Sequence, residues 1–119
     1  MSEDDSIQRR SYYRLRYFAE IDDSPQVEID GQYYRLVELS EGGARIETGA
    51  TRFGERAEIR GRIHYNDIDY DTFEATVLRT ERTEIVMRFF RGIGLKRMID
   101  EQRRMRLHYP HLYRPKLVA

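Results

Sequence analysis

Apolar and polar residues alternate with a period of two through most of this chain. The clearest example runs from residue 57 to residue 65, where small, aliphatic and aromatic residues alternate with charged ones and a histidine. Because successive side chains of a strand point to opposite faces of a sheet, this pattern predicts a half-buried β-strand. The same period recurs in residues 27–29, 33–39, 44–46, 73–77 and 85–89. Six or seven short antiparallel strands at this spacing predict a small barrel or sandwich.

Two turn signals lie between the first of these strands. The Asp30-Gly31 dipeptide is typical of a two-residue β-hairpin, and Ser40–Gly43 interrupts the alternation as a second turn. Strict alternation between these turns places Val37 and Leu39 on one face of their strand and Leu36 on the other.

The pattern changes to helical spacing near the C-terminus. We expect one amphipathic helix over about residues 95–107, ending before Pro110. The residues that fall near one face of this helix are Leu95, Met98, Ile99, Gln102 and Met105.

The length of 119 residues suits one domain. We expect residues 1–8 to be a flexible tail, residues 9–107 to be the domain with its C-terminal helix, and residues 108–119 to be a C-terminal tail. The N-terminus is acidic rather than a secretory signal, and no run of about 18 apolar residues is present. These features predict a cytoplasmic protein without membrane insertion.

The composition of the chain limits the classes of function that it can have. The chain has no cysteine, which excludes thiol catalysis, iron–sulfur clusters and disulfides. All but two of the 21 basic residues are arginine, the side chain that makes planar, two-pronged contacts to phosphate and guanine. The net charge is zero, which disfavours an oligonucleotide-binding barrel, because binding a nucleic acid polymer needs a strong basic field. A small anionic ligand held by a few arginines remains compatible with this composition.

Two sequence features resemble metal-binding sites, but neither has the full set of ligands. Asp67, Asp69 and Asp71 resemble the start of a calcium loop, but its sixth and twelfth positions hold Thr72 and Leu78 instead of glycine and glutamate. An exposed strand face near a hairpin is the simpler interpretation of these aspartates.

Metal binding at His108 and His111 is also disfavoured, because a zinc site needs three or four ligands. Ser40 has no histidine base near it in the sequence, and no G-x-S-x-G motif is present. We therefore expect no metal, no cofactor and no enzymatic activity.

Two short motifs carry the functional prediction. Arg10 and Arg14 form an R-x-x-x-R motif ahead of the first strand, and Glu38–Gly43 forms an acidic-x-S-x-x-G motif at the end of a later one. In this order and spacing the pair resembles the PilZ domain family. The resemblance implies a mostly β fold, a six-stranded antiparallel β-barrel with the arginine segment lying against the serine–glycine turn.

The resemblance also implies a receptor for the bacterial second messenger cyclic di-GMP. Arginine can bind the O6 and N7 edge of guanine, pair with phosphate and stack on a base. A glycine turn frees backbone groups and lets a flat base approach. The ligand-binding residues that follow from the resemblance and this chemistry are Arg9, Arg10, Arg14, Glu38, Ser40, Gly42 and Gly43. Tyr12 and Tyr13 could stack on a guanine, but packing is the favoured role for them.

Two details qualify the resemblance. The family's turn motif usually opens with Asp or Asn, whereas this chain has Glu38, which is one methylene longer. The basic residue Arg9, ahead of the pair, resembles the position associated in the family with binding two ligand molecules, which gives the hypothesis of two cyclic di-GMP molecules per chain.

The resulting hypothesis is a receptor whose N-terminal segment changes conformation on binding cyclic di-GMP and signals to an unidentified protein partner, as in motility or biofilm regulation. The alternative is a ligand-free adaptor for pilus assembly or motility.

Overall fold

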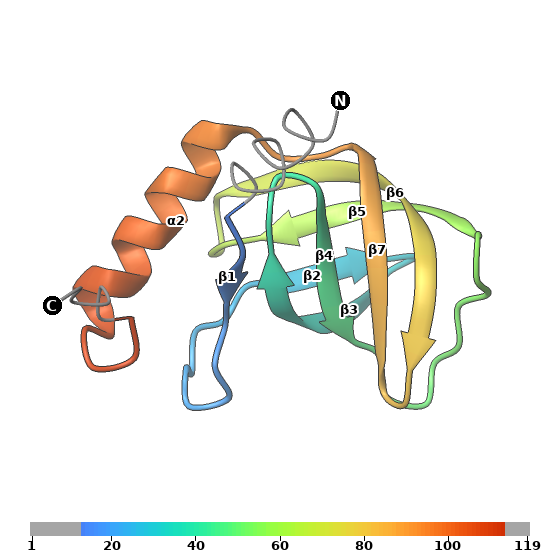
Figure 1. The fold of residues 1–119 in the computed structure, drawn as a ribbon, viewed down its shortest axis with the longest axis horizontal. Coiled ribbons are helices and arrows are strands. Elements are labelled where there is room, and N and C mark those ends of the chain that lie inside the picture. The colour runs from blue at the N-terminus through green and yellow to red at the C-terminus, as the bar shows by residue number, and fades with distance from the viewer. Residues whose placement is uncertain (1–12, 114–119) are drawn as a thin grey trace, which may run out of the picture.

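The computed structural model describes residues 13–113, which form seven strands and one helix (Figure 1). No helix in this part of the chain is long and apolar enough to cross a membrane. The elements are β1 (Leu15–Arg16), β2 (Gln26–Ile29), β3 (Gln32–Leu39), β4 (Gly43–Glu47), β5 (Glu58–His64), β6 (Tyr70–Glu81), β7 (Glu84–Arg91) and α2 (Leu95–His108).

Six of the strands close into an antiparallel barrel. The sheet runs in the order β1-β3-β2-β5-β6-β7-β4, and an additional pairing of β3 with β4 closes it. The short strand β1 lies outside this ring and pairs with the end of β3. The predicted six-stranded antiparallel barrel with a C-terminal helix is therefore confirmed.

The interior of the barrel is filled by the inward-facing side chains of its strands. Because these positions alternate with outward-facing polar ones, each strand of the barrel except β5 contributes two or more residues to one core, and β5 contributes Ile63. The side chains that are completely inaccessible to solvent include Val27, Leu36, Leu39, Ile46, Ile63, Ala75, Val77 and Ile85.

The Asp30-Gly31 turn has the geometry that the sequence predicts. Both residues have positive φ angles, 52° and 77°, and Ile29 and Gln32 pair on either side of them. This is the two-residue hairpin whose backbone twist matches the twist of the flanking strands.

The strict alternation predicted for β3 is wrong at Val37. Leu36 pairs with Ile46 and Glu38 pairs with Arg45, so Val37 is an extra residue that forms a β-bulge. The bulge returns Leu39 to the core face and turns Glu38 outward, whereas unbroken alternation would have placed both Leu36 and Glu38 inside. Val37 is buried but lies outside the main core cluster.

The helix α2 lies beside the barrel, next to β1 (Figure 1). Its bounds agree with the predicted range of 95–107 within one residue. Met98 and Met105 are buried as expected, but Leu95 and Ile99 are exposed. The third buried position of the helix belongs to a carboxylate, Glu101, which lies three residues after Met98 and four residues before Met105 on the same side of the helix.

Polar contacts explain the burial of Glu101, which is only 3% exposed. The hydroxyl of Tyr17, just after β1, donates to Glu101 Oε1 at 2.7 Å. Arg104, one turn later on the helix, donates to both carboxylate oxygens at 2.9 and 3.0 Å. Burial raises the pKa of Tyr17 well above its usual range, so this hydroxyl keeps the proton that it donates. The buried carboxylate thus joins β1 to the middle of α2.

A second polar contact holds the start of the helix. Arg97 donates to both oxygens of Asp69 at 2.7 and 2.8 Å and to Asp71 at 2.9 Å, and its guanidinium lies 4.3 Å from the ring centre of Tyr65. Two of the three aspartates that resemble a calcium loop are therefore ion-paired to an arginine.

Candidate functional site

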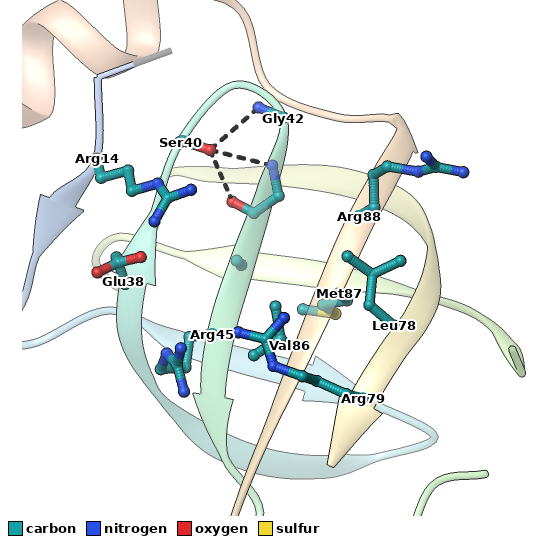
Figure 2. A pocket seen from close by; sticks show the side chains of 12 residues that line it. Arg14, Glu38, Ser40, Gly42, Arg45, Leu78, Arg79, Val86, Met87 and Arg88 are labelled. Carbon is teal, nitrogen blue, oxygen red and sulfur yellow. Dashed lines mark hydrogen bonds between the residues drawn. The ribbon is translucent and has the colours of Figure 1, made fainter. Parts of the chain in front are cut away.

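A cleft of about 320 Å³ opens beside the β3–β4 turn (Figure 2). Five of the seven ligand-binding residues predicted from the sequence line it, and the other two, Arg9 and Arg10, lie outside the described residues. The full lining consists of Arg14, Glu38, Ser40, Gly42, Gly43, Ala44, Arg45, Leu78, Arg79, Val86, Met87 and Arg88.

Two β-bulges shape opposite sides of this cleft. The bulge at Val37 turns Glu38 toward it from β3. On β6, Val77 pairs with Met87 and Arg79 pairs with Val86, so Leu78 is a second extra residue, and its side chain is 44% exposed. Bulges commonly lie next to functional sites because they re-aim side chains, and here both do so.

The side chain of Ser40 organises the β3–β4 turn. Its Oγ accepts hydrogen bonds from the amides of Gly42 and Gly43, both at 3.2 Å, and donates to the Gly43 carbonyl at 3.4 Å (Figure 2). The Ser40 amide also donates to the Gly43 carbonyl, at 2.9 Å. The Gly42 carbonyl accepts from the amide of Phe89 at 2.9 Å. The expectation that the turn leaves these backbone groups free is therefore wrong for this conformation. Serine is needed at this position because a short hydroxyl side chain can cap two successive amides.

Gly43 is required by the close approach of two strands. A Cβ atom added to it would lie 2.2 Å from the carbonyl oxygen of Met87 on β7. The obstructing atom belongs to the backbone, so the strands themselves would have to separate. The glycine of the sequence motif is thus a packing requirement of the barrel as well as one wall of the cleft.

Replacing Gly43 with alanine is expected to lower the free energy of unfolding by about 2 kcal/mol, because the added methyl forces β4 away from β7. Gly54→Ala is the matched control, since a Cβ there meets no atom within 4 Å, and it is expected to change stability by less than about 0.5 kcal/mol. Urea denaturation of both variants measures the difference. Equal stability of the two would contradict the close approach.

Two of the arginines in the cleft are already ion-paired. Arg45 donates to Glu81 and to Glu84, the second at 3.2 Å, and Arg79 donates to Glu81 at 2.6 Å. The hydrogen bond that Arg45 donates to Glu81 raises the pKa of Arg45, and the bonds that Glu81 accepts from Arg79 and Arg45 lower the pKa of Glu81. The positive charges of Arg45 and Arg79 are therefore largely neutralised by Glu81 and Glu84 before any ligand binds.

Arg14 and Arg88 are different, because neither forms an ion pair with any residue in the range 13–113. Both are exposed, and they lie on opposite sides of the Ser40–Gly43 turn (Figure 2). Arg14 does not pair with Glu38, although both line the cleft. Two arginines that have no counter-charge within residues 13–113 line one cleft, and they make a local site of positive potential in a chain of zero net charge.

Sequence reasoning missed Arg88. The alternation of buried residues in β7 indicates that it points outward, but its neighbour across the sheet is Gly43 of β4. That pairing joins segments more than 40 residues apart and follows from the strand order, which the alternation does not contain.

Comparison with known proteins decides the family. The model of the PilZ domain matches residues 8–109, which is most of the chain. The chain belongs to the PilZ domain family. Among solved structures, the crystal structure of an uncharacterized Legionella protein is similar to this PilZ domain. The two share 21% sequence identity and a TM-score of 0.55 over 83% of this chain and 99% of the other, which supports the fold alone. None of the curated proteins is significantly similar to the chain in sequence.

PilZ domains are in general cyclic di-GMP receptors or related adaptor domains rather than enzymes. Both motifs that carry the sequence resemblance lie within the matched range. The described part of the R-x-x-x-R motif and the acidic-x-S-x-x-G motif meet at the cleft.

Proposed function

We propose that this PilZ domain is a receptor that holds cyclic di-GMP between Arg14 and the Ser40–Gly43 turn. Arg9 and Arg10, from the segment that precedes Arg14, close over the ligand from the same side. Binding changes the conformation of this N-terminal segment, and a partner protein reads the new surface. In this proposal the chain has no catalytic role.

The chemistry of the cleft matches the ligand. Cyclic di-GMP presents two phosphates and two guanines, and arginine can pair with the first and form a two-pronged contact with the second. Arg14 and Arg88 have no competing carboxylate partner among residues 13–113. Leu78, exposed by its bulge, offers an apolar surface on which a base can pack.

The single observation that carries the proposal is the convergence of the two motifs. Arg14 precedes β1, Glu38 is the last residue but one of β3 and Gly43 begins β4, yet all three line one cleft. Arg88 adds to it from a fourth segment, β7. The pairing of Leu15 with Leu39 holds Arg14 beside the turn, and the pairing of Gly43 with Arg88 brings the second arginine to it.

The competing function is an adaptor that binds no ligand. The satisfied backbone of the β3–β4 turn favours it, because a ligand must displace the 3.2 Å bonds between Ser40 Oγ and the two glycine amides if it is to use those amides. These bonds are long for N–H···O contacts, so their exchange for ligand contacts costs little.

A calorimetric titration of the chain with cyclic di-GMP separates the two functions. We expect saturable binding at two ligand molecules per chain, the second held through Arg9. A ratio of one would reject the two-ligand hypothesis and leave the receptor in place. Absence of any binding heat, confirmed by an unchanged melting temperature at millimolar ligand, would leave only the adaptor.

A further inference from the structure

The side of α2 that faces away from the barrel is unusually apolar for an exposed surface. Leu95, Ile99 and Leu107 are 57%, 43% and 75% exposed. Ile99 and Leu107, eight residues apart, lie on the side of the helix away from the buried Met98 and Met105, and Leu95 lies at the edge of that side. Between them runs a shallow groove of about 340 Å³, lined by Ile99, Gln102, Arg103, Arg106 and Leu107. We call the residues of this groove together with Leu95 the outer face of α2.

The outer face also carries two positive charges that have no counter-charge within the described part of the chain. Three other basic residues of the helix, Lys96, Arg97 and Arg104, form ion pairs with aspartate or glutamate. Arg103 and Arg106 form none with any residue between positions 13 and 113, and both are exposed. Arginine is enriched and lysine is depleted at protein interfaces relative to the rest of the surface, and on this face the two arginines lie beside exposed aliphatic side chains.

We propose that the outer face of α2 is the docking surface for an acidic, amphipathic helical segment of a partner protein. Apolar side chains of that segment pack on Ile99 and Leu107, as in other helix-in-groove complexes. Its carboxylates form two-pronged pairs with Arg103 and Arg106, which the described chain leaves without a counter-charge.

The surface is connected to the cleft by an unbroken set of contacts. Arg14 is followed directly by β1. In the antiparallel pairing of β1 with β3, Arg16 lies opposite Glu38, which lines the cleft. Tyr17, the next residue, donates its hydroxyl to Glu101, which lies on the opposite side of the helix from Leu107 and Arg103. A ligand that engages Arg14 therefore acts on the strand that holds α2 in place. The expectation that ligand binding alters docking rests on the proposed receptor function, whereas the docking itself does not.

Two further hydrogen bonds restrain the backbone of Arg16 and Tyr17. Arg35 donates to the carbonyl oxygen of Tyr17 at 2.6 Å, and the hydroxyl of Tyr113, beyond the end of α2, donates to the carbonyl oxygen of Arg16. A shift of β1 is thus transmitted to both the middle and the far end of the helix.

Selection from a phage-displayed library of random 16-residue peptides tests the docking surface. The target is the full chain without ligand, and the counter-target is the double variant Arg103→Glu/Arg106→Glu. We expect the selected peptides to be net negative, with leucine or isoleucine three or four positions apart, and to bind the double variant at least tenfold more weakly. The variant Arg52→Glu/Arg60→Glu, which changes the same charge on other exposed positions, should bind them as the wild type does.

Several results would overturn the proposal. Selected peptides that are neutral or basic, or that bind the double variant equally, exclude an acidic partner at this face. Concentration-dependent dimerisation abolished by Arg103→Glu/Arg106→Glu would assign the face to a second copy of the chain. Binding to phosphatidylglycerol–phosphatidylcholine vesicles, abolished by the same variant, would assign it to a membrane surface.

The ligand dependence is measured separately. The best selected peptide is titrated with and without saturating cyclic di-GMP, and its affinity is expected to change at least threefold. The double variant should bind cyclic di-GMP as the wild type does, because neither arginine lines the cleft. If the wild type binds no cyclic di-GMP, the receptor function fails, and the ligand-free selection still decides the docking surface.

Discussion

Glu101→Ala is expected to lower the free energy of unfolding by about 3 kcal/mol, a large effect for a helix residue of a small barrel. The change removes the acceptor for the buried Tyr17 hydroxyl and the two carboxylate oxygens of Glu101 to which Arg104 donates. Breaking a buried pair from one side is costly because the remaining partners stay desolvated without a hydrogen bond. The side chain of Arg104 is 25% exposed and also contacts Asp23, which places the loss at the lower end of the range for buried pairs.

Two further variants separate the lost pairing from the lost packing. Tyr17→Phe removes one hydrogen bond and leaves Glu101 paired with Arg104, so it should cost about 1 kcal/mol. Glu101→Gln keeps the shape of the side chain and one acceptor oxygen, and it should fall between Tyr17→Phe and Glu101→Ala. Urea denaturation followed by circular dichroism measures all three. A loss below about 0.5 kcal/mol for Glu101→Ala would mean that α2 is not held through this carboxylate.

Arg14→Ala is expected to weaken cyclic di-GMP binding roughly tenfold to hundredfold while leaving stability almost unchanged. One or more charge-assisted hydrogen bonds are lost, each worth about 1.5–3 kcal/mol, and a change of 1.4 kcal/mol is a factor of ten in affinity. The fold should tolerate the change because the Arg14 side chain is exposed and ion-paired to no residue of the described chain. Arg10→Ala should behave in the same way if its side chain closes over the ligand from the same segment.

The matched control for this measurement is Arg60→Ala. Arg60 is an exposed arginine on β5, its side chain is 85% exposed, and it does not line the cleft. Calorimetric titration should give the wild-type affinity for Arg60→Ala and a weakened one for Arg14→Ala. Equal affinities in all these variants would place any ligand outside the cleft.

Much of this fold follows from local patterns. The period-two segments became strands, the Asp30-Gly31 dipeptide became the expected hairpin, and the helix ends within one residue of its predicted end. These features depend on interactions between neighbours in the sequence, which the alternation of side chains records directly. The grouping of Glu38, Ser40 and Gly43 was also predictable, because one strand end and one turn contain all three.

The remaining features depend on contacts between distant segments. The bulges at Val37 and Leu78 arise where one strand carries an extra residue relative to its partner, so neither strand alone shows them. Arg88 reaches the cleft because β7 pairs with β4, which is set by barrel closure. Glu101 is buried because Tyr17, 84 residues earlier in the chain, supplies its hydrogen bond. Helical spacing places position 101 beside Met98 and Met105, but a glutamate is almost never fully buried unless it is paired, and its partner is not visible in the local sequence.

The central claim is that cyclic di-GMP lies in the cleft between Arg14 and the β3–β4 turn. The most direct test is a two-dimensional nitrogen–proton NMR titration of the labelled chain with cyclic di-GMP. The account predicts that the largest amide shifts occur at Gly42, Gly43 and Arg88, because the glycine amides exchange their bonds to Ser40 Oγ for contacts with the ligand. Shifts concentrated on the outer surface of β5, with these amides unmoved at saturation, would contradict it.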